Sequence, residues 1–187
     1  MPISLYSTSI DLFIKSLESL ERMLQKAQAH SPHSSTTLAA ARLHEDMLPL
    51  SFQVQQVSNI SRRFVDRILP AVAGAASEER GRTPVWEDKE ATVGELLARV
   101  DKSLAFLRGI DAAELADGEE DRVIELPMGR TETIKAHVMG YALGWAVPDI
   151  FFHVSTAYAI LRMHGVPLGK KDYLLPYLEP IVLSQSN

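Results

Sequence analysis

The stretch PDIFFHVSTAYAILRMHG, residues 148–165, carries a clear helical pattern. Apolar residues recur every three or four positions, which is the spacing of one face of an α-helix. Pro148 suits the first turn of a helix because its backbone has no N–H to leave unpaired there, and Gly165 suits a helix end. The sequence therefore predicts a helix over residues 148–164. Its apolar stripe comprises Ile150, Val154, Ala157 and Leu161.

A polar pair borders this stripe. Asp149 and His153 are four residues apart, so both lie on one face of the predicted helix. One interpretation makes the pair half of a metal site. The other makes Asp149 a helix-start carboxylate that interacts favourably with the helix dipole, beside a histidine that bonds a neighbouring side chain. The spacing is compatible with both interpretations.

Apolar spacing predicts three more helices, over residues 9–29, 38–69 and 92–108. Pro49 falls inside the second and predicts a bend there. Thr92 and Glu95 form a capping-box pattern at the start of the third. A short two-stranded hairpin is predicted around residues 127–129, between the third and fourth helices. The chain is thus predicted to be all-α, a single domain over residues 1–187 that forms an antiparallel four-helix bundle.

Composition excludes several functions. Nineteen Lys and Arg against 24 Asp and Glu leave a net charge of −5, which disfavours nucleic acid and anionic membranes as partners. No cysteine is present, so disulfides, thiolate nucleophiles and thiolate metal ligands are excluded. No apolar run reaches the length of a membrane span. We therefore expect a cytoplasmic protein. Wide apolar stripes and aromatic residues in its loops favour a homodimer.

Two segments carry a family resemblance. PDIFFHVSTAYAILRMHGVPLGKKDYL, together with RLHEDMLPLSFQVQQVSNISRRF further upstream, resembles an uncharacterised family of small helical proteins within the DinB-like and YfiT-like superfamily. The resemblance covers nearly the whole chain. It implies a four-helix bundle, often dimeric, in a superfamily regarded as metalloenzymes, and it implies no particular reaction.

The wider superfamily binds a divalent metal through three histidines, one on the second helix and an HxxxH pair on the fourth. By this resemblance His153 matches the last histidine, and Asp149 replaces the first histidine of the pair. His44 lies on the predicted second helix, where the third ligand would come from. Two imidazoles and a carboxylate suit zinc, iron or nickel. Of the two interpretations, we favour a protein without a metal.

Two function classes follow. We favour a dimeric module that binds a small molecule or a partner in a polar pocket between helices. The alternative is an enzyme acting on a small organic substrate, either through a metal held by His44, Asp149 and His153, or with Asp149 and His153 as an acid–base pair. The other residues predicted to bind a ligand are Asp46, Gln53, Trp145, Tyr158 and Arg162.

Overall fold

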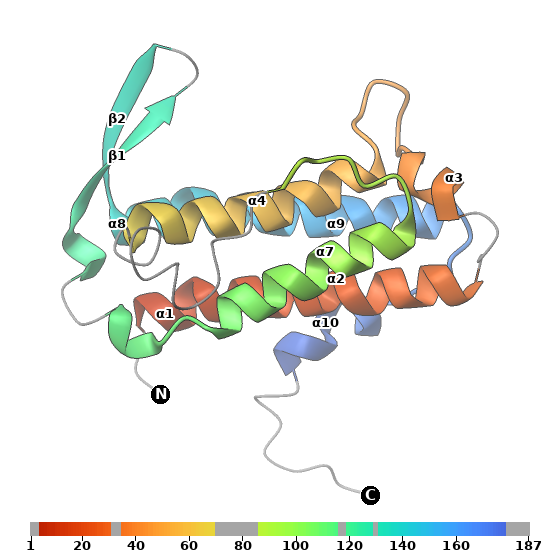
Figure 1. The fold of residues 1–187 in the computed structure, drawn as a ribbon, viewed down its shortest axis with the longest axis horizontal. Helices are drawn as coiled ribbons and strands as arrows, with labels where there is room; N and C mark the ends of the chain where they lie inside the picture. Colours follow the sequence, from red (N-terminus) through yellow and green to blue (C-terminus); the bar gives the residue numbers. More distant parts are fainter. Residues whose placement is uncertain (1–3, 31–34, 70–85, 116–118, 129–130, 179–187) are drawn as a thin grey trace, which may run out of the picture.

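The computed structural model describes residues 4–30, 35–69, 86–115, 119–128 and 131–178. Within these ranges the main architecture is a bundle of four long helices (Figure 1). They are α2 (Ile10–His30), α4 (Leu50–Ile68), α7 (Val93–Arg108) and α9 (Val147–Met163). The prediction of an all-α bundle is confirmed.

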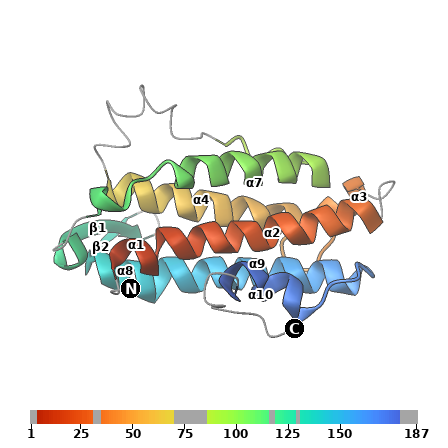
Figure 2. The ribbon, with the colours of Figure 1, turned by 90° about the horizontal axis from the view of Figure 1, so that it is seen from below.

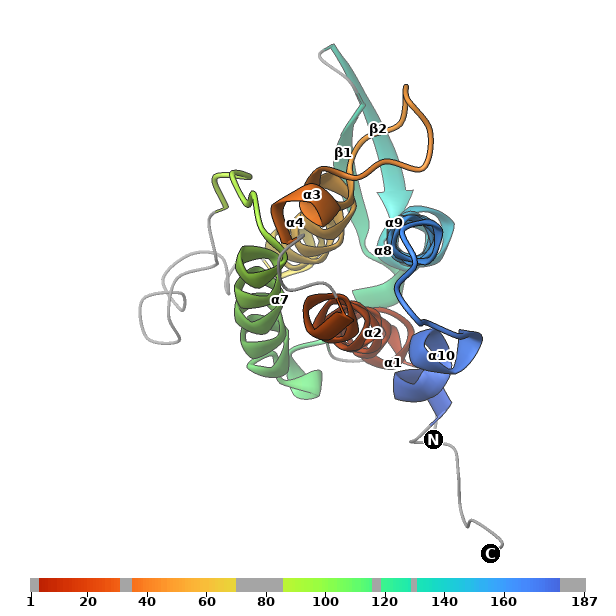
Figure 3. The same ribbon diagram turned by 90° about the vertical axis from the view of Figure 1, so that its right-hand side faces the viewer.

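The four helices surround a common core, seen end-on in Figure 3. α2 and α9 run in one direction and α4 and α7 in the other (Figures 1 and 2). The most extensive packing joins antiparallel pairs, α2 with α7 and α4 with α9. α4 and α7 run parallel, so α7 begins at the end of the bundle at which α4 begins (Figure 1).

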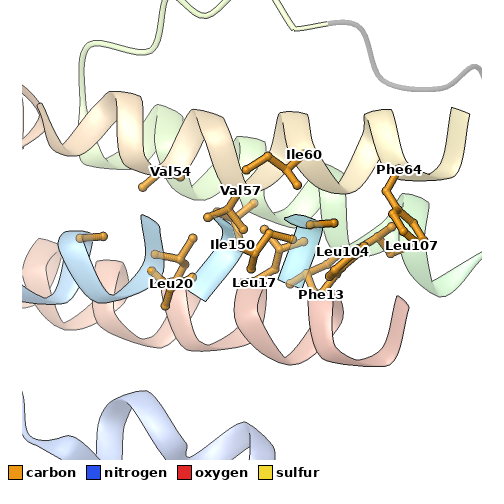
Figure 4. Packing of buried hydrophobic residues seen from close by; sticks show 14 of the residues in the cluster. Phe13, Leu17, Leu20, Val54, Val57, Ile60, Phe64, Leu104, Leu107 and Ile150 are labelled. Atoms are coloured by element: carbon orange, nitrogen blue, oxygen red, sulfur yellow. The ribbon is translucent and has the colours of Figure 1, made fainter. Parts of the chain in front are cut away.

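The core is filled by the apolar stripes that the sequence shows. Phe13, Leu17 and Leu20 of α2 face α4 and α9 in the centre of the bundle (Figure 4). Phe13 meets Phe64 of α4 edge to face, with ring centroids 5.1 Å apart. α7 begins as its capping box predicts: the Thr92 side chain accepts from the Glu95 backbone N–H, and the Glu95 side chain accepts from that of Thr92. Local sequence signals and burial therefore agree in these helices.

The predicted helix over residues 38–69 is wrong in its first third. The chain forms a short helix α3 (Ser35–Ala40), then an irregular loop over residues 41–49, and only then α4. Pro49 does not bend a helix. It is the N-cap of α4, with an extended backbone, because its ring blocks a continuous helix but is compatible with a helix start. His44 consequently lies in the loop.

The helix over residues 148–164 also begins earlier than predicted. α8 (Val138–Tyr141), a π-helical turn η4 (Ala142–Ala146) and α9 follow one another without a break. Pro148 cannot donate a backbone hydrogen bond to the preceding turn, and the wider π-turn beside it is the kind of local adjustment that lets a helix continue there. Asp149 is therefore not a helix-start carboxylate, since two further turns of helix precede it.

The predicted hairpin is confirmed between α7 and α8. Strands β1 (Val123–Met128) and β2 (Glu132–His137) pair antiparallel, with Val123 opposite His137. The hairpin projects from the end of the bundle at which α4 ends and α8 begins (Figure 1). Arg122 anchors its base by donating to the carbonyl of Ile68, the last residue of α4. The hairpin thus walls one end of the α4–α9 interface.

A helix that the sequence analysis did not predict, α10 (Lys170–Leu178), packs outside α2 (Figure 3). Tyr177 of α10 is hydrogen-bonded to Ser16 of α2 at 2.7 Å. Across the parts of the chain that the structure describes, no helix combines the length and apolarity that a membrane crossing requires.

Candidate functional site

His153 lies on the inner side of α9, almost fully buried, and its strongest polar contact is with Gln53 of α4. Its Nδ1 is 2.8 Å from Gln53 Oε1, and Gln53 Nε2 donates to the Leu48 carbonyl at 2.9 Å. The second bond fixes the amide orientation, because a carbonyl can only accept. Gln53 therefore presents an acceptor to His153, and the Nδ1 atom must carry the hydrogen.

Asp149 lies one turn before His153, with its Oδ1 atom 3.3 Å from His153 Nε2. Burial lowers the pKa of His153 below its ordinary value, the Asp149 carboxylate opposes this effect, and the charge of Arg63 adds to the lowering. Burial prevails because the carboxylate contact is long. At neutral pH the imidazole is therefore uncharged, and its Nε2 atom is left with a lone pair facing Asp149.

Asp149 also lines a pocket of about 190 Å³ between α4 and the α8–η4–α9 helix. Three of its lining residues are one turn apart along the latter: Tyr141, Trp145 and Asp149. Arg63 and Arg67 project from α4 on the opposite side. The apolar part of the wall is formed by Ile60, Leu126 and Pro127, the last two from the hairpin.

The two arginines make this pocket positive. Arg67 donates to the Tyr141 hydroxyl at 2.6 Å and lies over the Tyr141 ring, whereas Arg63 has a long contact of 3.4 Å with Gln56. Within the described ranges no carboxylate is in ion-pair distance of either guanidinium, in contrast to the neighbouring Arg62, which pairs with Asp66 at 2.6 Å. Toward the described residues, most of their N–H donors therefore have no partner and can bind an anion.

The structure separates the other predicted site residues from this pocket. His44 and Asp46 lie in the exposed 41–49 loop and pair with each other at 2.6 Å. Tyr158 packs edge to face against Tyr173 of α10. Arg162 is exposed and reaches only the Val166 carbonyl, at 3.4 Å. None of these four residues is among the described residues that line the pocket with Asp149.

Sequence reasoning missed Arg63 and Arg67. Arg63 and Arg67 are four residues apart on α4, immediately beside the core residues Ile60 and Phe64. Two arginines bordering an apolar stripe at helical spacing were a usable signal. Their proximity to Asp149 could not be predicted from the sequence, because it depends on how α4 and α9 pack.

Comparison with known proteins places the chain in a family. Residues 5–174 match the model of a domain of unknown function, DUF1993. The chain belongs to the DUF1993 family. The crystal structure of a DinB family member protein from Shewanella denitrificans is 30% identical over 91% of each chain, with a TM-score of 0.74. The search of curated proteins gives no match. The family is thus an uncharacterised one with a DinB-like fold.

The metal site of the wider superfamily does not fit these residues. Of the three expected ligands, Asp149 and His153 are close together, but His44 is in an exposed loop and bonded to Asp46. Among the residues with described positions, no three histidine, aspartate or glutamate side chains are arranged to hold a metal ion. The structure therefore does not form the predicted ligand set of His44, Asp149 and His153.

Proposed function

We propose that this DUF1993 protein binds a small organic anion, a carboxylate or a phosphate ester, in the pocket between α4 and α8–η4–α9. The observation that carries the proposal is the pair of guanidiniums, Arg63 and Arg67, on one wall of a 190 Å³ cavity without a carboxylate partner among the described residues. Guanidiniums recognise carboxylate and phosphate oxygens through paired N–H donors. The apolar and aromatic wall would hold the remainder of the ligand.

Calorimetric titration with small carboxylates and phosphate esters tests this proposal. Arg67→Met and Arg63→Met each remove one charge and are expected to weaken binding at least tenfold. Arg162→Met is the matched control, because Arg162 is an exposed arginine on α9 that does not line the pocket. Equal binding by all three variants and the original protein, or no binding of any anion, would contradict the proposal.

A second function, acid–base chemistry on the bound anion, is supported by the Asp149–His153 contact at 3.3 Å. Asp149 lines the pocket, and the Nε2 lone pair of His153 behind it can store a proton that the carboxylate has accepted. Exchange of a ligand C–H proton for deuterium in D₂O, followed by NMR, tests this function. The exchange is expected to disappear in Asp149→Asn.

We also propose a homodimer formed through the outer face of α9. Phe152 and Met163 are 59% and 53% exposed, and Phe152 packs beside His153. Apolar residues this exposed on one helix favour a protein partner. Sedimentation of the original protein is expected to show a dimer, and Phe152→Glu a monomer. Val123→Glu, on the hairpin at a 54% exposed position, is the control. A single species of about 20.7 kDa for the original protein would refute the dimer.

A further inference from the structure

The negative charge of Asp149 is unfavourable in a pocket that binds a simple anion. Its side chain is 35% exposed, and it is the only carboxylate among the described residues that line the pocket. A carboxylate beside two guanidiniums weakens their attraction for an anion and repels the anion itself. Asp149 therefore lowers the affinity for a plain carboxylate, unless something supplies it with a donor or a positive charge.

His153 offers Asp149 only a long contact. Its hydrogen is on Nδ1 and is given to Gln53, whose orientation is fixed in turn by the Leu48 carbonyl. The Nε2 atom is 3.3 Å from Asp149 Oδ1, which is a long contact. Within the described ranges, Asp149 has no shorter polar contact, and Arg63 and Arg67 have no carboxylate in ion-pair distance.

A ligand that carries both an anion and a cationic donor satisfies both requirements. We propose that the pocket binds an α-amino acid with an apolar side chain, its carboxylate on Arg63 and Arg67 and its ammonium group on Asp149. The side chain would lie against Ile60 and Leu126 of the apolar wall and against the neighbouring Trp145. A cavity of about 190 Å³ suits a ligand of this small size. This inference rests on the proposed anion-binding function and names its ligand class.

The experiment compares four compounds that share one branched carbon skeleton, by calorimetric titration at pH 7.5. Leucine has both charged groups, 4-methylpentanoate lacks the ammonium group, 3-methylbutylamine lacks the carboxylate, and 2-hydroxy-4-methylpentanoate has a neutral donor. Leucine is expected to bind at least tenfold more tightly than each of the other three. In Asp149→Asn, leucine and 4-methylpentanoate are expected to bind equally, with 4-methylpentanoate no weaker than in the original protein.

The variants separate the inference from the function on which it rests. Asp101→Asn, at an exposed carboxylate on α7, is expected to leave all four affinities unchanged. If 4-methylpentanoate binds and leucine binds no better, the inference is overturned and the anion-binding proposal stands. If neither acid binds, both fail. Equal affinity for leucine and its hydroxy analogue overturns the ammonium contact. Melting temperatures of each variant show whether it is folded, and Asp149→Ser repeats the test with a smaller side chain.

Discussion

Replacement of Arg99 by leucine is expected to be among the most destabilising changes in the chain. Arg99 is on α7 and is only 2% exposed. Its guanidinium pairs with Asp88 at 2.7 Å and Glu90 at 3.0 Å, and donates to the Gln55 carbonyl and the Asn59 side chain. These contacts fasten the segment before α7 to α4.

The magnitude follows from what the substitution leaves behind. Burial alone would raise the pKa of Glu90, yet hydrogen bonds from Gln55 and Arg99 hold it below its ordinary value. Without Arg99, this largely buried carboxylate keeps its charge and loses its counter-ion. Breaking a buried pair in this way costs about 3–5 kcal/mol. For a protein of this size, that loss lowers the melting temperature by roughly 6–20 °C, at about 2–4 °C per kcal/mol.

Arg108→Leu is the matched control on the same helix. Arg108 pairs with Glu18 at 2.7 Å, but its side chain is 56% exposed. An exposed pair contributes about 0.2–1 kcal/mol. Urea unfolding followed by circular dichroism measures both losses. The double variant Arg99→Leu/Glu90→Gln is expected to regain part of the loss, because it removes the uncompensated charge. A loss in Arg99→Leu no larger than in Arg108→Leu, or no recovery in the double variant, would refute the reasoning.

Three further predictions concern the polar cluster on α9. Gln53→Met leaves the His153 Nδ1–H unpaired and is expected to lower the free energy of unfolding, measured in urea, by about 1–3 kcal/mol. The control is Gln56→Met, at a half-buried position on the same helix, which is expected to lower it by less than half as much. Folding lowers the pKa of His153 below its unfolded value of 6.5. The neutral imidazole therefore contributes stability above pH 6.5, and this stability is lost as the pH falls below 6.5. The difference in unfolding free energy between the original protein and His153→Gln is therefore expected to shrink from pH 7 to pH 5. Asp149 and Arg63 are the charged groups that act on the pKa of His153. A difference that stays constant with pH would contradict the lowered pKa. Added Zn²⁺ is expected to leave the melting temperature unchanged. Stoichiometric metal in the purified protein that is lost in both His153→Ala and His44→Ala would instead show that these residues bind a metal.

The sequence alone determined the helices whose signals are local. The capping box at Thr92 and the apolar spacing of α2, α7 and α9 predicted their positions, because a helix face repeats every three to four residues whatever it packs against. The pairing of Asp149 with His153 followed from the same periodicity. Local signals misled at Pro49, since a proline in an apolar periodic run is compatible with both a bent helix and a new helix start.

Only the tertiary structure decided which side chains meet across the bundle. Gln53 reaches His153, and Arg63 and Arg67 face Asp149, because α4 packs antiparallel to α9 with the hairpin closing one end. His44 is turned away from that site by the loop over residues 41–49. Contacts between residues about 100 positions apart depend on the rotation and register of whole helices. Periodicity specifies which face of a helix is apolar, but it does not specify the neighbour against which that face packs.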